Sequence, residues 1–286
     1  MCINIIQGGE IMSVPYNKLT ESDKNNIISI YYNPNYKNFT FKQMANLCGV
    51  SERAFSRVLT EKGINTKLKN RYKIENEKYF DEINTENKAY FLGLLFADGY
   101  VGNENQIIIE LRDVGNTKKI LDTFVSELKS NIDIKINNHK KTGGFSTNST
   151  FLKISFSNKY INEALKKLGL GSHKGLSRFN IPKEVIDNKL QAHFIRGLFD
   201  GDGSSYIKNK NRKTPQKCIT FMGNDSLLLE IREILVNELN VNRNNIRKST
   251  NSDKISELRF GGNKQVEKIS NYLYNNSHIY LDFKKF

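Results

Sequence analysis

Residues 89–101 read AYFLGLLFADGYV, and residues 192–206 read AHFIRGLFDGDGSSY. Each stretch is an apolar run of helical length that ends in Asp-Gly. Each run also holds two small residues spaced four apart: Gly93 and Ala97 in the first, Gly197 and Gly201 in the second. Residues at this spacing share one face of a helix, and small side chains there let two helix backbones approach closely. The sequence therefore predicts two helices packed against each other.

An acidic residue ends each apolar run, Asp98 in the first and Asp202 in the second, and a helix-stopping glycine follows each of them. If the two helices pack together, their C-terminal ends meet and the carboxylates lie side by side. The negative ends of the helix dipoles add to this charge. Cations relieve it, and oxygen ligands suit Mg²⁺. Alternatively, Asp-Gly is a common turn that merely ends a core helix, but two equivalent copies favour the metal site.

The composition indicates a polyanionic partner, because 44 Lys and Arg face 30 Asp and Glu and leave a net charge of +14. Nucleic acid is the first candidate. The alternative explanation is a genome whose base composition favours Lys and Asn codons, and the two explanations are compatible. Cys2, Cys48 and Cys218 show neither a disulfide framework nor zinc spacing, which favours a reducing compartment. We find no signal-peptide pattern and no apolar run of membrane-spanning length. We therefore expect no membrane partner and an intracellular location: the cytoplasm or nucleoid of a bacterial or phage-infected cell, or an organelle matrix.

Changes in pattern divide the chain into five predicted segments. Residues 1–18 form a leader, with Met12 as a second plausible start. Residues 19–69 are helical, with one amphipathic helix over 21–32 and two short helices around a turn at 48–50. Residues 70–87 are polar and charged and are expected to be a linker. Two halves of a repeat follow, at 88–180 and 181–286.

Both halves of the repeat show the same predicted order of elements, αββαββα. In the first half, the expected strands after the apolar helix are 106–113, 132–136 and 151–156, and the expected helices are 117–129 and 159–168. In the second half, the expected strands are 204–208, 217–222, 245–248 and 257–260, and the expected helices are 225–239 and 264–274. The predicted fold class is α+β, with two four-stranded sheets related by a pseudo-twofold axis and a small all-α N-terminal domain.

The segments FLGLLFADG (91–99) and IRGLFDGDG (195–203) resemble the two LAGLIDADG motifs of single-chain homing endonucleases. The resemblance runs from about Lys88 to the C-terminus. It implies a double-stranded DNA endonuclease of duplicated αββαββα fold, whose curved sheets lie in the major groove of a long asymmetric site. The enzyme would be a monomer that cuts across the minor groove and leaves short 3′ overhangs. The sixth motif position is Asp200 in the second copy but Phe96 in the first, so unequal strand cutting, or nicking, remains open.

By this resemblance Asp98 and Asp202 are catalytic and metal-binding, with Ala97 and Gly201 as further metal-site positions. The cofactor would be Mg²⁺ or Mn²⁺, while Ca²⁺ would occupy the site without supporting cleavage. The reaction would be in-line attack of an activated water on phosphorus, with no protein nucleophile. The family usually adds a basic residue near the metals. Lys153 and Lys254 are the candidates, although each is equally well a solvated surface lysine.

Contacts to DNA are expected from the strands and their hairpins, where Arg reads guanine, Asn and Gln read adenine, and Lys touches phosphate. The candidates are Asn103, Asn105, Gln106, Arg112, Lys208, Lys210, Arg212, Lys213, Lys217, Arg247, Lys248 and Arg259. Each of them taken alone is equally consistent with an ordinary surface residue, so the prediction rests on their clustering.

Residues 41–59 carry a helix-turn-helix pattern. Ala45 is the small residue of the first helix, Gly49 the turn and Ser51 the N-cap of the second helix. The exposed face of that second helix would present Arg53, Ser56 and Arg57 to the major groove. The alternative is a three-helix bundle that only packs on the nuclease.

The predicted function is a site-specific double-stranded DNA homing endonuclease. Two alternatives use the same scaffold: an intron RNA maturase, with RNA as its partner, and a catalytically idle DNA-binding regulator. The intact pair Asp98 and Asp202 favours cleavage, because neither alternative needs two clustered acids.

Overall fold

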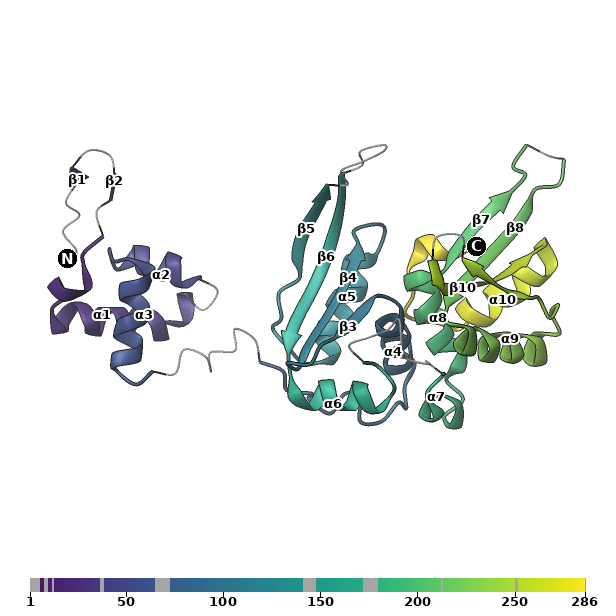
Figure 1. The fold of residues 1–286 in the computed structure, drawn as a ribbon, viewed down its shortest axis with the longest axis horizontal. Coiled ribbons are helices and arrows are strands. Elements are labelled where there is room, and N and C mark those ends of the chain that lie inside the picture. The colour runs from purple at the N-terminus through teal and green to yellow at the C-terminus, as the bar shows by residue number, and fades with distance from the viewer. Residues whose placement is uncertain are drawn as a thin grey trace. The chain divides into compact units, whose positions relative to one another are not determined.

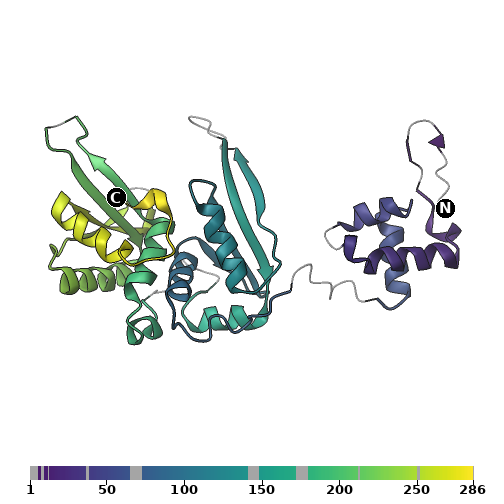
Figure 2. The ribbon, with the colours of Figure 1, turned by 180° about the vertical axis from the view of Figure 1, so that it is seen from behind.

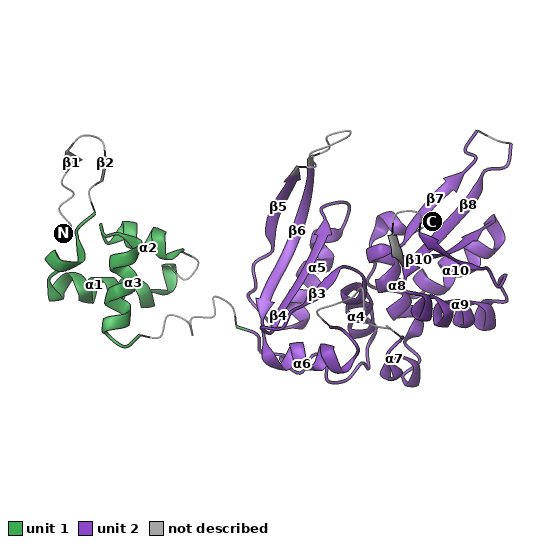
Figure 3. Ribbon diagram, viewed as in Figure 1, with its two compact units in different colours: residues 1–73 green, residues 74–286 purple. Residues whose placement is uncertain are grey.

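The computed structural model describes residues 6–7, 10–11, 13–36, 39–64, 73–140, 148–171, 180–211, 213–249 and 252–285. The chain divides into two compact units, Met1–Lys73 and Ile74–Phe286 (Figure 3). None of the helices in the described part of the chain combines the length and apolar character needed to span a bilayer.

The first unit is built from three helices, α1 (Glu21–Tyr32), α2 (Phe41–Leu47) and α3 (Glu52–Glu61). The smaller elements of the unit are β1 (Ile6–Gln7), β2 (Glu10–Ile11), η1 (Tyr16–Lys18) and η2 (Pro34–Tyr36). Ser51 caps α3 by accepting from the backbone of Ala54, and Gly49 turns the chain before it at φ +66°. The buried side chains of Ile27, Met44, Phe55 and Val58 form the core of the unit. The expected helix at 21–32 is confirmed.

Part of the segment expected to be a leader, 1–18, packs on this unit. The amide of Val14 donates to the carbonyl of Gly49 at 2.9 Å, and Tyr16 packs against the core. The prediction of a separate leader is therefore wrong for these residues, because the aromatic ring at position 16 has a partly buried place on the three helices.

The expected linker at 70–87 is also corrected. Ile74 bridges to Ser130, and Tyr79 and Phe80 are 1% exposed, each with its ring 6.3 Å from that of Phe124. The segment from Ile74 onward belongs to the second unit, because its aromatic side chains are buried there.

The second unit contains the two halves of the repeat (Figure 1). The first half consists of α4 (Glu86–Asp98), β3 (Gly99–Val101), β4 (Gln106–Arg112), α5 (Thr117–Glu127), β5 (Lys135–Lys140), β6 (Asn148–Ser157) and α6 (Lys159–Lys167). The second half consists of α7 (Lys183–Asp187), α8 (Gln191–Asp202), β7 (Ser204–Lys208), β8 (Gln216–Gly223), α9 (Asp225–Leu239), β9 (Ile246–Ser249), β10 (Ser252–Gly261) and α10 (Asn263–Tyr274), followed by η4 (Asp282–Lys284).

Each half forms a four-stranded antiparallel sheet, ordered β3-β4-β6-β5 in the first and β7-β8-β10-β9 in the second. The predicted order αββαββα is confirmed. Two details differ. The strand expected at 132–136 is β5 and pairs with β6 only from Lys135, because Ile132 is buried in the connection before it. Helix α7 has five residues and is too short to show a helical period in the sequence.

One face of each sheet packs on helices, and we call the other its open face. On the packed face of the first sheet Ile107, Ile109 and Leu111 are buried, while Arg112, on the alternate parity of the same strand, is exposed. In the second sheet Leu258 and Phe260 face α9 and α10, so Glu257 and Arg259 lie on the open face.

Candidate active site

The two helices that end in Asp-Gly are the closest-packed elements of the second unit. They lie side by side between the sheets in both views (Figures 1 and 2). A Cβ added to Gly93 would lie 2.0 Å from the carbonyl oxygen of Phe194, and one added to Gly197 would lie 2.0 Å from that of Tyr90. The contact is reciprocal, as a pseudo-twofold axis requires. The predicted helix pair with small residues at its seam is confirmed.

The C-terminal ends of α4 and α8 meet at this seam. A Cβ on Gly201 would overlap the Cβ of Ala97 and would lie 2.9 Å from Oδ2 of Asp98. The Asp98 carboxylate therefore lies against the last turn of α8, one residue before Asp202. Asp98 is half-buried and Asp202 is exposed, so both residues reach solvent, and both lie near enough to act on the charge of Lys284.

The sixth motif position differs between the halves in its packing. Asp200 is 1% exposed and accepts from Tyr90 Oη at 2.9 Å, Tyr274 Oη at 2.6 Å and the amide of Leu281 at 2.7 Å. Burial raises the pKa of Asp200 to about 6, although these hydrogen bonds act to lower it. Phe96 instead packs edge-on against Phe194. Asp200 thus directs its oxygens into the fold, and the two halves are chemically unequal.

A buried arginine joins the middle of α8 to the N-terminal end of α4. Arg196 is 1% exposed and donates to Glu86 at 2.7 Å, to the carbonyl of Leu273 at 2.8 Å and to that of Ile279 at 2.9 Å. Because Glu86 begins α4 and Arg196 lies within α8, this ion pair fixes the position of one helix along the axis of the other. The acidic C-terminal ends are thereby held at the same level.

Lys284 is a basic residue beside the acids that no pattern in the sequence indicates. Its ammonium donates to the carbonyls of Gly203 and, at 3.4 Å, of Gly201. Burial lowers the pKa of Lys284, whereas the carboxylates of Asp200, Asp98 and Asp202 act in the opposite direction. A pocket of about 360 Å³ opens here, lined by Asp98, Glu110, Leu111, Arg112, Val114, Phe151, Asp200, Gly201, Leu281, Phe283 and Lys284.

The two lysines expected at this site are placed differently. Lys153 does not line the pocket; it lies on the open face of the first sheet, with Glu110 opposite it on β4 and Lys135 on β5. Glu110 accepts from Asn137 at 2.8 Å, and the ring of His139 lies 3.1 Å away. Lys153 is thus a neighbour of Glu110, which itself lines the pocket, and a role of Lys153 beside the metal-site acids stays a prediction. The side chain of Lys254 lies outside the described residues.

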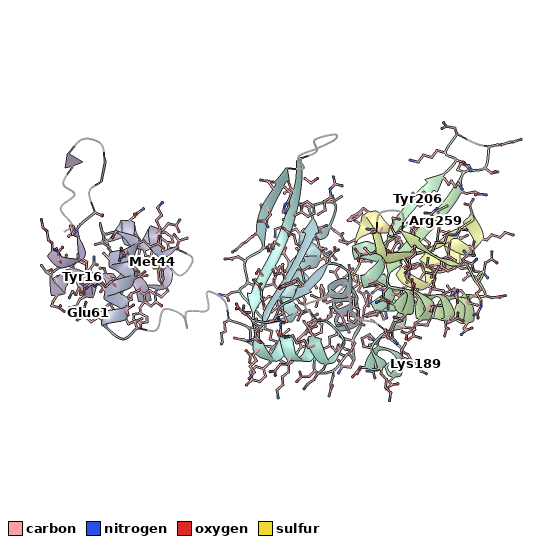
Figure 4. All side chains as sticks on the ribbon, in the orientation of Figure 1. Tyr16, Met44, Glu61, Lys189, Tyr206 and Arg259 are labelled. Atoms are coloured by element: carbon pink, nitrogen blue, oxygen red, sulfur yellow. The ribbon has the colours of Figure 1, made fainter. Side chains whose placement is uncertain are left out.

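The predicted DNA contacts divide by strand parity. Lys208, Arg247 and Arg259 lie on the open face of the second sheet, and Arg259 pairs with Glu257 at 3.0 Å. Figure 4 labels Arg259 and Tyr206 on this sheet. With Arg243, Asn244, Asn245, Lys248 and Gly261, the three basic residues and Glu257 line a groove of about 710 Å³.

Two further predicted contacts have the strand parity of the packed side, and their role in DNA binding stays a prediction. Lys248 pairs with the carboxylate of Asp225 on α9 at 2.9 Å, although its exposed side chain also lines the groove. Lys217 shares the parity of Ile219 and so also belongs to the packed side. Strand alternation, not charge, decides which lysines reach the open face.

The remaining predicted contacts lie in loops or at strand ends. Asn103, Gln106, Arg112, Lys210 and Lys213 are exposed. Asn105 is half-buried with φ +60°, and its carbonyl accepts from the amide of Asn158. Arg212 lies outside the described residues.

On α3 of the first unit, Arg53 and Arg57 are exposed and Ser56 is half-buried. The guanidinium of Arg57 lies 4.0 Å from the centre of the Tyr16 ring, a cation–π contact. Tyr16 also donates to Glu61 at the end of α3, and Figure 4 labels both residues. The stacking holds Arg57 at the exposed side of the helix.

The donors at the paired helix ends are all oxygens. Among the described residues, no group of three or more His, Cys, Asp or Glu side chains gathers where a metal could be held. Two carboxylates, Asp98 and Asp202, with the backbone carbonyls of Ala97 and Gly201, make an incomplete set that suits Mg²⁺ or Mn²⁺, which keep waters and accept phosphate oxygens. The ammonium of Lys284 on the Gly201 carbonyl marks this end of α8 as a place where a cation is bound.

The chain is similar to one family model and to several solved structures. A family model described as LAGLIDADG-like domain matches residues 189–273, and none of the curated proteins compared matches the chain. Among solved structures, the homing endonuclease I-WcaI bound to its DNA recognition sequence is 14% identical with a TM-score of 0.51, over 73% of this chain and 91% of that chain.

Two further solved structures are the I-SmaMI LAGLIDADG homing endonuclease bound to cleaved DNA and the LAGLIDADG meganuclease I-AabMI bound to uncleaved DNA. The first is 13% identical, TM-score 0.43, over 71% of this chain and 86% of that chain. The second is 11% identical, TM-score 0.42, over 68% and 85%. At 14% identity the likeness to I-WcaI concerns the fold, and it confirms the α+β arrangement of two four-stranded antiparallel sheets.

Proposed function

We propose that this chain is a site-specific double-stranded DNA endonuclease of the homing type. One observation carries the proposal: the reciprocal glycine contacts of α4 and α8 set the Asp98 carboxylate against Gly201, beside Asp202. A buried helix pair that ends in two solvent-facing acids, between two sheets with basic open faces, suits a phosphodiester that carries negative charge. The net charge of +14 and the fold shared with I-WcaI support the same conclusion.

Asp98, Asp202 and the carbonyls of Ala97 and Gly201 would hold Mg²⁺ or Mn²⁺. When bound, the metal would lower the pKa of a water and offset charge on the scissile phosphate. The residues of the chain position the reacting groups. The glycine contacts between α4 and α8 fix the two carboxylates, and the open faces of the sheets hold the duplex across them. Each acid then serves one strand across the minor groove, which would leave short 3′ overhangs. Because Phe96 and Asp200 make the halves unequal, we expect the two strands to be cut at unequal rates.

The experiment that tests this function is cleavage of DNA that spans the insertion junction of the gene itself, with the product ends mapped. Double-strand breaks with short 3′ overhangs in Mg²⁺, absent in EDTA, are the expected result. Binding of the junction without cleavage in Mg²⁺ or Mn²⁺ would instead indicate a DNA-binding regulator on this scaffold. Preference for intron RNA over the junction DNA would indicate a maturase.

The two sides of the second sheet offer a matched pair of variants for the DNA contact. Arg247→Gln is expected to weaken DNA binding about tenfold, because the groove then lacks one of its basic residues. Lys268→Gln removes a charge on α10, a helix that covers the packed face, where the ammonium donates to the carbonyl of Leu239 at 3.0 Å, and is expected to change binding less than about twofold. Affinities measured at one fixed salt concentration check this, and equal losses for the two variants would contradict the assignment of faces.

We further propose that α2 and α3 act as a helix-turn-helix that lengthens the DNA site. Neutralising Arg53 and Arg57 should weaken binding and reduce the log–log salt slope by about one unit for each phosphate that the variant no longer neutralises. Lys62→Gln is the control in the same unit, because Lys62 is paired with Glu21 at 2.8 Å. A salt series of binding constants gives the slopes; an unchanged slope in the arginine variants would show that α3 does not touch DNA.

A further inference from the structure

The last residues of the chain form a strap along α8, which we define as residues 278–285. Three side chains from α4 and α8 hold it. Glu86 accepts from the amide of His278 at 2.8 Å, Arg196 donates to the carbonyl of Ile279, and Asp200 accepts from the amide of Leu281. These three groups follow the helix pair from its far end toward the acids, so the strap runs in the same direction.

The strap is also tied to the first half of the repeat. Asn116 donates to the carbonyl of Tyr280 at 2.8 Å and accepts from the amide of Asp282 at 3.1 Å. Ile279 and Leu281 are 4% and 2% exposed, so these two side chains of the strap are part of the core. Anchors on both sides of the helix pair give its last turn, η4, a defined position.

The position of η4 brings the ammonium of Lys284 to the end of α8. The ammonium donates to the carbonyls of Gly201 and Gly203, on either side of Asp202, and it shares the pocket with Asp98. The carbonyl of Gly201 is one of the oxygens that the proposed function gives to the divalent metal. Two cations cannot use one carbonyl at the same place without strong mutual repulsion.

We propose that Lys284 is an internal cation that competes with the divalent metal for the oxygens at the paired helix ends, the Gly201 carbonyl and the carboxylates of Asp98 and Asp202. The inference rests on the proposed function. Without metal, the ammonium offsets the repulsion between two carboxylates at two negative helix ends. Metal binding then requires the ammonium to leave the Gly201 carbonyl, which the long flexible side chain allows while the strap stays in place. The chain thereby lowers its own metal affinity.

The test measures Mn²⁺ binding to the full chain without DNA, by calorimetry and by electron paramagnetic resonance. Lys284→Met keeps most of the apolar stem and removes the charge, and we expect it to bind Mn²⁺ about tenfold more tightly than the wild type. Lys284→Arg keeps a cation and should stay within about twofold of the wild type. The control Lys285→Met removes an exposed neighbouring charge that lies over the Tyr280 ring, and should leave the affinity unchanged. In EDTA, Lys284→Met should also have the lowest Tm of the four proteins, with Mn²⁺ restoring it.

Unchanged or weaker Mn²⁺ binding by Lys284→Met overturns the inference, and so does a gain of equal size in Lys284→Arg or Lys285→Met. The variant Asp98→Asn separates this failure from that of the proposed function. If Asp98→Asn loses Mn²⁺ binding while Lys284→Met is unchanged, only the competition fails. If no variant binds Mn²⁺, or Asp98→Asn binds it as the wild type does, the metal assignment fails and the inference fails with it.

Discussion

The variants Asp98→Asn and Asp202→Asn are each expected to lose at least about a thousandfold in double-strand cleavage while still binding target DNA. The loss is on the scale seen when one charged group is removed from a phosphoryl-transfer site. Asparagine keeps the size of the side chain but not the charge that the metal requires. Binding should be unchanged or tighter, because the acids repel the substrate phosphates and contribute nothing to affinity.

Supercoiled plasmid carrying the target gives the clearest measurement, because nicked and linear products separate on a gel. Asp122→Asn is a suitable control, since this acid lies on the surface of α5 and pairs with Lys118. If each acid serves one strand, each single variant still nicks the strand that the remaining acid serves. This nicking is lost in turn when the metal concentration is lowered. Normal linear product from both Asp98→Asn and Asp202→Asn would contradict the assignment of the metal site.

The repeated part of the fold is predictable because local patterns and tertiary structure agree there. The pairs Gly93 with Ala97 and Gly197 with Gly201 predict a close helix contact, and the contact follows directly from their spacing. Alternation in 106–112 likewise predicts which side chains of β4 are buried. In both cases the period of the element is enough to decide the face.

The side of the sheet on which an expected contact lies depends on information beyond one element. The charge of Lys217 favours DNA binding, although its parity with Ile219 and Phe221 places it on the packed side. The direction of Lys248 needs the register of β9 against β10, which is a tertiary fact. The segment from Ile74 has the composition of a linker because its charged residues outnumber Tyr79, Phe80 and Ile83, the three that are buried.

The position of Lys284 beside the acids cannot be predicted from the sequence, for a different reason. The final residues, LDFKKF, have no periodicity and no fixed spacing from either acid. Their position is decided by Glu86, Arg196 and Asp200, whose buried polar groups need partners and find them in the backbone of the strap. A buried Arg or Asp in an apolar helix predicts that some backbone will pair with it, but not which.

The variants Gly93→Ala and Gly197→Ala are expected to destabilise the Ile74–Phe286 unit by about 4 kcal/mol or more. Each new Cβ would lie 2.0 Å from a backbone carbonyl oxygen of the facing helix, which has no side-chain freedom to move away. The helices must separate, and the separation opens the core around them, so the cost exceeds that of ordinary overpacking. Because the acids sit at the ends of the same helices, cleavage should fall as well, even in the fraction that folds.

The sign of the effect makes this test decisive. In an exposed helix, Gly→Ala stabilises by about 1 kcal/mol, because alanine is the better helix former. The control Gly171→Ala lies in a connection after α6, where an added Cβ meets nothing within 4 Å, and should leave the stability unchanged or raise it slightly because alanine restricts the unfolded chain. Thermal unfolding is the measurement, and the seam variants should lower the Tm of their unit by roughly 8 °C or more. A raised Tm in Gly93→Ala or Gly197→Ala would mean that the two helices do not meet backbone to backbone, and the pairing of Asp98 with Asp202 would lose its structural basis.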